Sequence, residues 1–489
     1  GANPLLAGLT TNVFSVFNSN YASSTRTGAG LVQTTGSVNG VAWDPVNRRV
    51  YTSAYVKRHA GLGSNGIGAV YSMNPATNTT AFWFNVTSLG IDLGQNNYNG
   101  TNPFPTNAAR GLTANSVYSE DPVFDEVGKY GIGDIETNDV DTLYLTNLYG
   151  RTVHALPIPV GGGAPTSQTS LGMPGSAVTC NAGTGTARPF ALAYKDGYLY
   201  AGVVCDAASG TRADLDAYVV RTPATGAGSG TWAQYGPRID LDYDKGPVFT
   251  SANNSVTFAN NRWNVWDPTF DNSWDPGTDS STHSGGSRND DYIFRPTPML
   301  SDIELDDDGS LILAFRDRTT DQLGSFNAPP NAEDSTGTYP FANTTSISNP
   351  RLVHGMSGGD ILRVCNVSGT WVVDGATSAC PNHNESGAVS NNNQGPNSGE
   401  FYAGDINGSH TEISFGHLAL APRTGQVLLS SLNAENGTVN SGGVRGLSNS
   451  TGQRIDDISA NYYVADDRPS VGGARFAKAN GMGDLEALC

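Results

Sequence analysis

The sequence is poor in charge and in long apolar runs. Charged residues make up 15 % of its 489 residues and hydrophobic residues 37 %, whereas glycine and proline occur 60 and 26 times. Long amphipathic helices need a continuous apolar face, a charged face and few glycines or prolines. The composition therefore excludes a coiled coil, a helical bundle and a solenoid of helices. It favours many short strands that are joined by turns and polar loops.

Basic residues are scarce. The 27 Lys and Arg stand against 45 Asp and Glu, which gives a formal net charge of −18. Binding to nucleic acid needs a basic stripe, and because none is visible we predict no nucleic-acid partner. No run of 18 apolar residues occurs, so we predict no membrane insertion by this segment. The first six residues lack the basic and then apolar pattern of a signal peptide and suggest a mature or trimmed N-terminus.

Cysteine is rare, and none of the five copies has a Cys-x-x-Cys or zinc-finger spacing. The sequence favours a disulfide between Cys365 and Cys380, which flank an apparent hairpin, and a second one between Cys180 and Cys205. A bond between Cys205 and Cys489 is the alternative to the second pairing. Disulfides persist in oxidising compartments, so we expect the protein to be secreted or held at the cell surface.

A weak internal repeat runs through the chain. A short apolar strand, a turn and an alternating strand rich in Val, Leu and Tyr recur five times. The opening strands of these hairpins are expected at residues 40–44, 133–136, 190–194, 301–305 and 417–421. Two of the turns are Asp-Gly, a strong hairpin signal because both residues accept positive φ. Third and fourth strands follow several hairpins, and such a repeated antiparallel unit is typical of a β-propeller blade.

The two ends of the chain each carry part of one more unit. Residues 483–488 match an opening strand without a hairpin after it, and residues 12–17 form a strand without an opening strand before it. Together they would complete a further blade. The sequence therefore predicts an all-β, six-bladed propeller, alternatively seven-bladed, whose ring is closed by the N- and C-terminal strands. We expect one domain over residues 1–489, with a closing strand and linker at 1–37 and long surface insertions at 238–298 and 319–357.

Three opening strands carry an Asp-x-Glu pair whose two acids share one face of the strand. Because the opening strand of a propeller blade lines the central channel, six carboxylates could surround the axis. Such a cluster is costly unless a cation or arginines balance it. One interpretation is a Ca²⁺ site in the channel, formed by Asp134, Glu136, Asp302, Glu304, Asp484 and Glu486. The alternative is a structural hub in which the acids cap loop amides or pair with Arg188, Arg316 and Arg318.

Catalytic motifs are weak, and we predict no catalytic residue. Residues 355–359 match a nucleophile elbow around Ser357, but a strand follows where that elbow requires a helix. His417 falls on an opening strand, where a buried, hydrogen-bonded role is expected. Trp263, Trp266 and Trp274 could stack on carbohydrate or could pin a long loop to the body of the protein.

Several strings carry a family resemblance. They lie at residues 188–192, 301–304 with 315–318, 399–405 and above all 479–489, where the chain reads Ala-Asn-Gly-Met-Gly-Asp-Leu-Glu-Ala-Leu-Cys. Together they resemble the N-terminal head region of large bacterial cell-surface proteins that carry serine–aspartate-repeat-type B domains downstream. The resemblance implies export, a surface or matrix setting and calcium in neighbouring domains. It supplies no site residue.

Two functions are compatible with the sequence. The first is a non-enzymatic extracellular or cell-surface module for adhesion or self-assembly, as a subunit of a surface layer, matrix or filament. Its partners would be further copies of the chain or other surface proteins or glycans. The second is a Ca²⁺-dependent propeller hydrolase or lyase acting on extracellular carbohydrate or lactone, with the channel ion as Lewis acid. The sequence favours the first, because no His or Tyr stands in an obviously partnered position.

Overall fold

The fold is all-β and is described here from a computed structural model. Short strands dominate it, and the helices are single turns or little more, as in α1 (Val32–Thr35) and α2 (Arg318–Leu323). No helix among the described residues is long and apolar enough to cross a membrane. The structure describes residues 12–16, 27–112, 121–181, 183–250, 257–258, 261–271, 274, 290–324, 327–330, 352–373, 394–397, 399–407, 410, 412–434, 441–455, 461–466 and 481–488.

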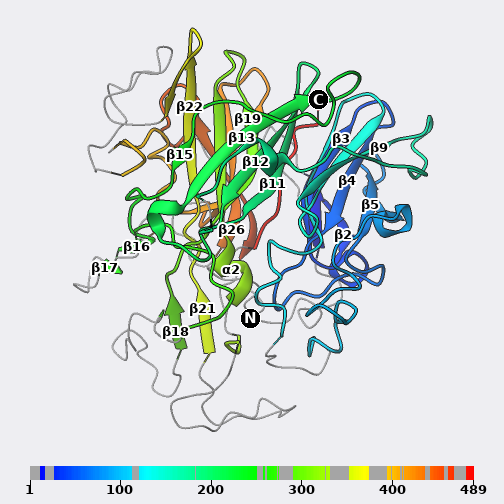
Figure 1. The fold of residues 1–489 in the computed structure, drawn as a ribbon, viewed down its shortest axis with the longest axis horizontal. Helices are drawn as coiled ribbons and strands as arrows, with labels where there is room; N and C mark the ends of the chain where they lie inside the picture. The colour runs from blue at the N-terminus through cyan, green and yellow to red at the C-terminus, as the bar shows by residue number, and fades with distance from the viewer. Residues whose placement is uncertain are drawn as a thin grey trace.

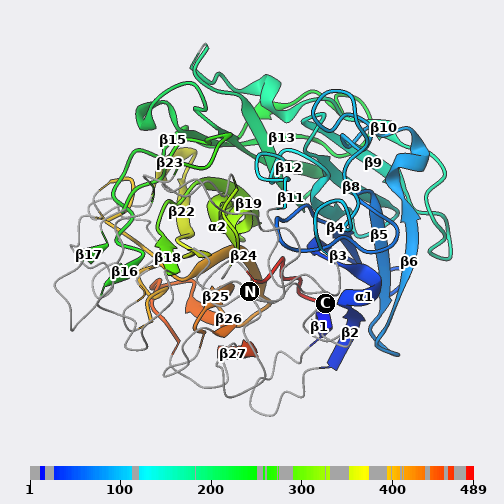
Figure 2. The ribbon, with the colours of Figure 1, turned by 90° about the horizontal axis from the view of Figure 1, so that it is seen from below.

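Five antiparallel sheets form blades around one axis, which is seen end-on in Figure 2. Each blade starts at the axis with an opening strand and proceeds outward. The first blade consists of β3 (Val38–Asp44), β4 (Arg49–Ala54), β5 (Ala69–Asn74) and β6 (Thr79–Asn85). The second consists of β7 (Ile132–Thr137), β8 (Thr142–Asn147), β9 (Thr152–Pro157) and β10 (Thr169–Ser170). The third is β11 (Ala187–Lys195), β12 (Tyr198–Cys205), β13 (Asp216–Pro223), β14 (Ala233–Gln234), with β15 (Ile239–Asp240) also paired to β13.

The remaining two blades complete the ring. The fourth blade consists of β19 (Pro298–Leu305), β20 (Leu311–Asp317), β22 (Asp360–Val367) and β23 (Thr370–Val373). The fifth consists of β24 (Ser414–Ala421), β25 (Gln426–Leu432), β26 (Ser441–Ser448) and β27 (Asn461–Asp466). All five predicted hairpins are therefore confirmed as the two innermost strands of a blade. Apolar clusters lie between successive blades, for example where Leu300, Ile303 and Leu313 meet Tyr200 and Val219. Both faces of a blade are covered in this way, which explains why β20 is buried at every position.

The predicted number of blades and the predicted closure are wrong: there are five blades, not six or seven. The N-terminal strand β1 (Asn12–Val16) pairs with β2 (Thr27–Leu31), and β2 contacts β6, the outer strand of the first blade. Residues 481–488 lie between β24 and β3 instead. The Asp484 amide donates to Asn39 O at 3.2 Å, and Met482 and Leu485 pack on the apolar cluster of β25 and β26. The C-terminal segment thus occupies an inner position of the ring but has no hairpin after it. The opening-strand pattern therefore occurs six times in the sequence, whereas the structure has five blades.

Parts of the two predicted surface insertions lie inside the protein. All six residues of α2 are buried, and α2 contacts β21 (Leu352–Gly355), which pairs in parallel with β18 (Asp290–Ile293) (Figure 1). A short pair, β16 (Phe249–Thr250) and β17 (Thr257–Phe258), also falls in this region. Trp263 and Trp266 are fully buried, and Trp266 Nε1 donates to Pro298 O at 2.8 Å. These two tryptophans therefore pin their segment to the blades, as in the second of the two interpretations of the sequence.

The cysteines follow the favoured pairing where the structure describes them. Cys180 and Cys205 form a disulfide with a Cα–Cα distance of 5.5 Å, which excludes the alternative bond between Cys205 and Cys489. Cys365 is also disulfide-bonded. Its predicted partner Cys380 lies outside the described residues, so that pairing stays a prediction.

Candidate cation site in the central channel

A cavity of about 180 Å³ lies in the central channel, at the end where the hairpin turns of the opening strands are found. It is lined by all six acids that the sequence predicts for this place: Asp134, Glu136, Asp302, Glu304, Asp484 and Glu486. They come from β7, β19 and the C-terminal segment, which alternate around the axis with β11, β24 and β3. The three Asp-x-Glu pairs therefore meet in one place. Cation binding itself stays a prediction.

β-Bulges in the opening strands free the backbone amides that the aspartates bind. The register of each opening strand against its hairpin partner shifts once, for example between Pro189 and Leu192 in β11 and between Ser414 and Leu418 in β24. A bulge removes backbone amides from the ladder of the sheet. In β3, β11 and β24 the first residue after the shift therefore has an amide that can bond outside its own blade.

The three aspartates bind these freed amides. Asp134 Oδ2 accepts a hydrogen bond from the freed amide of β11 at 2.8 Å. Asp302 Oδ2 accepts from that of β24 at 2.7 Å, and Asp484 Oδ2 from that of β3 at 2.9 Å. The other oxygen of each aspartate accepts from the next amide of its own segment, at 2.8, 2.7 and 2.8 Å. Each aspartate thus fastens one inner segment to the next, and both of its oxygens are engaged.

The three glutamates lie one step nearer the turns and are less engaged. Glu136 Oε1 accepts from the Thr137 amide at 2.6 Å, and Glu304 Oε1 accepts from the Leu420 amide at 3.2 Å. Glu486 accepts no hydrogen bond within the described part of the chain. The glutamates therefore retain carboxylate oxygens that face the cavity.

The arginines that could have balanced these acids are used elsewhere. Arg188 pairs with Asp206 at 2.7 Å and Arg318 with Asp125 at 3.2 Å. Among the described residues, no Lys or Arg forms an ion pair with any of the six acids. The part of the structural alternative that pairs the acids with arginine is therefore wrong, whereas the part in which they cap amides holds for the aspartates.

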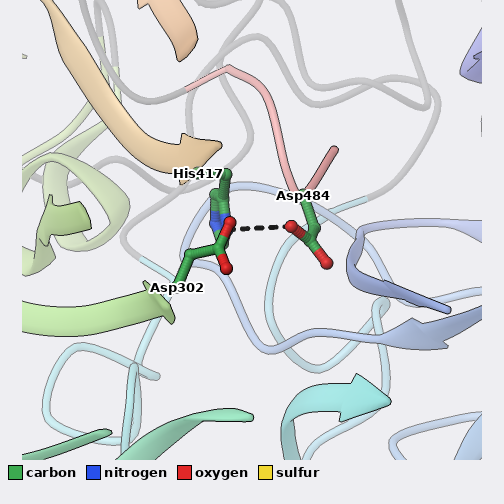
Figure 3. Close-up of side chains that lie close together, drawn as sticks. All are labelled: Asp302, His417 and Asp484. Carbon is green, nitrogen blue, oxygen red and sulfur yellow. Dashed lines mark ion pairs between the residues drawn. The ribbon is translucent and has the colours of Figure 1, made fainter. Parts of the chain in front are cut away.

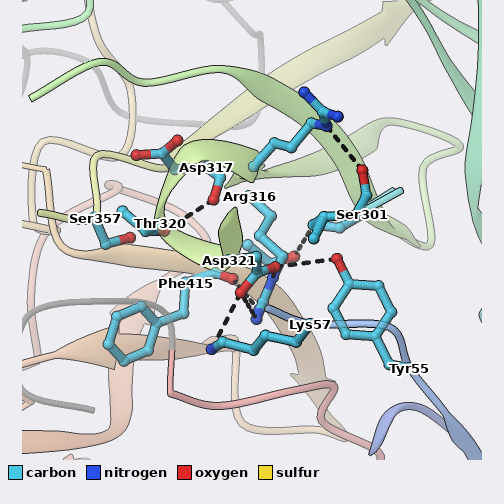
Figure 4. Close-up of polar contacts among 12 residues, drawn as sticks. Tyr55, Lys57, Ser301, Arg316, Asp317, Thr320, Asp321, Ser357 and Phe415 are labelled. Carbon is cyan, nitrogen blue, oxygen red and sulfur yellow. Dashed lines mark hydrogen bonds and ion pairs between the residues drawn. The ribbon is translucent and has the colours of Figure 1, made fainter. Parts of the chain in front are cut away.

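Arg316 instead belongs to a buried polar network at the opposite end of the channel (Figure 4). Its guanidinium binds the Asp321 carboxylate at 2.6 Å and donates to the carbonyl oxygens of Phe415 and Met482. Lys57 and the Tyr55 hydroxyl also bind Asp321, each at 3.1 Å. This network joins the first blade, the fourth blade and the C-terminal segment.

His417 lies in the aspartate layer, as Figure 3 shows. Its Nδ1 is 3.6 Å from Asp484 Oδ1 and 4.0 Å from Asp302 Oδ2, and its side chain has no exposed surface. Burial lowers its pKa, so at neutral pH the ring is uncharged and does not balance the two carboxylates. The imidazole does not line the cavity.

The electrostatics of the cavity favour protonation or a bound cation. Burial, followed by the charge of Asp484, raises the pKa of Asp134 and of Asp302 well above the usual range. Burial also raises the pKa of Glu136 and Glu486, and that of Glu304 to about 7. Lys195 lines the mouth, but its Nζ donates to the Leu305 and Asp306 carbonyls. The six acids that line the cavity offer carboxylate oxygens, which is the ligand type that Ca²⁺ prefers.

No protein-family model matches the chain. The curated relatives include Colossin-D and Colossin-C of Dictyostelium discoideum, each 23 % identical over 93 % of this chain. The chain spans 40 % and 38 % of the length of these two proteins. The resemblance to the head regions of bacterial surface proteins stays a prediction.

Similar solved structures include a periplasmic gluconolactonase from Pseudomonas aeruginosa, with a TM-score of 0.37, 11 % identity and coverage of 92 % of this chain and 94 % of that one. A putative 6-phosphogluconolactonase from Bacteroides fragilis has a TM-score of 0.34, 11 % identity and coverage of 92 % and 91 %. These values are too low to carry an argument about function.

Sequence reasoning missed two features of the acids' surroundings. Asp139, on the β7–β8 turn, also lines the cavity, and His417 contacts the aspartates. The burial predicted for His417 is confirmed, whereas the predicted hydrogen bonding is wrong, because neither ring nitrogen has a hydrogen-bond partner within the described part of the chain. Ser357, the candidate of the elbow motif, is fully buried, and its Oγ donates to Ser414 O at 3.4 Å. It is not placed to attack a substrate.

Proposed function

We propose that this chain is a calcium-binding β-propeller module, secreted or held at the cell surface, that acts in adhesion or self-assembly rather than in catalysis. The observation that carries the proposal is the cavity lined by six carboxylates, none of which pairs with Lys or Arg in the described part of the chain. So many negative charges repel one another strongly when partly buried. Calcium relieves this repulsion because it accepts six to eight oxygen ligands with loose geometry.

The aspartates and the glutamates have different roles in this proposal. The aspartates hold backbone amides with both oxygens, so they position the inner strands. The ion would therefore be held by Glu136, Glu304 and Glu486, whose carboxylates face the cavity, with Asp139 near the mouth. Because these glutamates belong to the second blade, the fourth blade and the C-terminal segment, the ion would tie together three separate parts of the ring.

Two further observations support an extracellular binding role. The Cys180–Cys205 disulfide fits an oxidising compartment. On the face that carries the cavity mouth, the turns expose apolar side chains of Val46 and Val140, and Val160 is exposed in the loop after β9. The Ile158 amide donates to Asp141 O, so the Val160 loop lies beside the turn of Val140. Exposed apolar side chains beside a charged mouth suit contact with another copy or another surface protein.

The absence of catalysis is proposed from the surroundings of the potential nucleophile and base. Ser357 is fully buried away from the cavity, and His417 lies below it with no exposed surface. Acid–base or nucleophilic catalysis requires a group that can reach the substrate. Neither residue meets that requirement.

A cation-dependent hydrolase or lyase acting on a carbohydrate or lactone is the second candidate. It is favoured by the position of Glu304, which lines the cavity and whose pKa burial raises to about 7. A carboxyl group with such a pKa can exchange a proton near neutral pH. In this case Glu304 would serve as acid or base, and the ion would polarise the bond that is broken.

Calorimetric titration of the chelator-treated protein with Ca²⁺ tests the first proposal. We expect binding in the parent, weaker binding in Glu136→Gln and unchanged binding in Asp196→Asn, whose exposed side chain lies in the β11–β12 turn. Sedimentation with and without Ca²⁺ then measures self-association. Absence of calcium binding in the parent protein overturns the proposed site.

A panel of lactones and glycosides separates the two candidates. Hydrolysis that requires Ca²⁺ and is lost in Glu304→Gln would establish the enzyme and refute the non-catalytic proposal.

A further inference from the structure

A second group of acids is buried at the other end of the fourth and fifth blades. Asp360 is the first residue of β22 and lies opposite Phe315 of β20, whereas the cavity-lining end of β19 pairs with the start of β20. Carboxylate oxygens of Asp360, Glu400 and Glu412 lie within 4.8 Å of one another. Asp405 adds a fourth buried carboxyl group, and its pKa is raised by burial and by the charges of Glu400 and Asp360. None of these residues lines the channel cavity.

Glu412 is the decisive member of this group. It has no exposed surface, and neither of its carboxylate oxygens accepts a hydrogen bond from any residue that the structure describes. Lys245 Nζ is 3.8 Å from Oε2, which is beyond hydrogen-bond distance. A buried carboxylate normally binds several donors, because its transfer out of water is otherwise unfavourable. One carboxylate oxygen of Glu412 instead lies within 4.8 Å of one carboxylate oxygen each of Asp360 and Glu400.

The neighbouring cations do not balance the group. Among the described residues, Lys245 supplies the single ammonium group beside the four carboxyl groups, and its Nζ also lies 5.1 Å above the Trp263 ring. Arg445 is close to Asp405, but its guanidinium donates to the backbone carbonyls of Gly404, Ile406, Asn433 and Ala434. Several buried acids thus share one ammonium ion.

We propose that Asp360, Glu400, Asp405 and Glu412 form a second, buried site for a divalent cation of the calcium type, independent of the channel site. These residues supply oxygen ligands from the start of β22 and from positions 400, 405 and 412, which precede β24. The ion would fasten these three residues, and with them the fifth blade, to the fourth blade. Tyr243 would hold the Asp360 ligand in place, because its hydroxyl donates to Asp360 Oδ2 and accepts a hydrogen bond from Trp263 Nε1 at 3.1 Å.

The buried tryptophan provides a selective probe. Terbium binds to calcium sites, and its emission is sensitised by energy transfer from a nearby indole, which decreases steeply with distance. The full-length, chelator-treated protein would be titrated with terbium under excitation of tryptophan. We expect sensitised emission that calcium removes by competition. Trp263→Phe should lose this emission while calorimetry still detects the ion.

Variants of the ligands test the site itself. Glu412→Gln should weaken terbium and calcium binding here about tenfold or more, because it removes one charge and one ligand oxygen. Asp405→Asn is a second variant, to be used if Glu412→Gln does not fold, and Asp196→Asn is the control that should bind as the parent does. Lys245→Met should bind calcium more tightly, because it removes a like charge from the site.

Any of three results would overturn the proposal. One is a parent protein without tryptophan-sensitised terbium emission. Another is equal emission and equal calcium affinity in the parent and in a folded Glu412→Gln or Asp405→Asn variant. The third is a Lys245→Met variant that is strongly destabilised and does not bind calcium, which would show that the ammonium group is the resident cation.

Discussion

Replacement of Glu304 by glutamine should change the stability of the protein in opposite directions with and without calcium. Glutamine keeps the length of the side chain, and its amide oxygen can still accept the hydrogen bond from the Leu420 amide. The substitution therefore removes the charge and little else. Glu304 is suited to this experiment because its pKa is raised to about 7, mainly through burial.

The magnitude follows from linkage. The pKa of Glu304 is raised to about 7 in the folded protein from the ordinary value of 4.5, which applies to the unfolded chain. When folding raises the pKa of a carboxyl group, the free energy of unfolding of the protein falls as the pH rises from the unfolded-state pKa to the folded-state pKa. Each pKa unit corresponds to about 1.4 kcal/mol, so at about pH 8 and without calcium this loss is at most about 3 kcal/mol. Glutamine does not ionise, so the variant escapes it.

Urea denaturation in chelator should therefore find Glu304→Gln more stable than the parent at about pH 8, by up to about 3 kcal/mol. The difference should disappear towards about pH 4, where Glu304 is protonated in both states. In millimolar calcium the order should reverse, because the bound ion stabilises the folded parent more than the variant that lacks one ligand. Asp196→Asn, in an exposed turn, should follow the parent under every condition.

The reasoning is refuted by two results. A variant that is less stable than the parent in chelator at about pH 8 would show that the Glu304 charge is already compensated within the protein. An equal gain from calcium in both proteins would place the ion away from Glu304.

Three further outcomes are expected. Reduction of the Cys180–Cys205 bond, or replacement of both cysteines by serine, should lower the free energy of unfolding in denaturant by about 3 kcal/mol, because the bond closes a loop with a sequence separation of 25. An unchanged midpoint of denaturation would contradict this. Peptide mapping without reduction should find Cys365 bound to Cys380, and recovery of a peptide that joins Cys365 to Cys489 would refute that pairing. Gly416→Ala should cost more than about 1 kcal/mol of stability in thermal or urea melts, because Gly416 has a φ of 83° and a Cβ atom there would lie 2.5 Å from Arg316 Cβ; a variant as stable as the parent would contradict the close approach of β24 to β20.

The sequence alone determined the local architecture. Alternation of apolar residues and the turns between them place five hairpins correctly, because the period of two and the turn conformation are properties of neighbouring residues. The same alternation places the Asp and Glu of each Asp-x-Glu pair on one face, which is why the six channel acids could be named in advance. For Cys205 the sequence favoured Cys180 but left Cys489 open, and the structure decided between them.

The tertiary structure decided how these parts combine. Residues 483–488 carry the pattern of an opening strand, but pattern does not specify a partner, and packing placed them between β24 and β3 without the N-terminal strand. Arg316 does not balance the channel acids, because in the folded protein its guanidinium binds Asp321 instead. The group around Glu412 combines residues from three segments far apart in the chain, none of which carries a motif. Such choices depend on which buried groups reach one another after the blades have closed, and this information is not present in any short stretch of sequence.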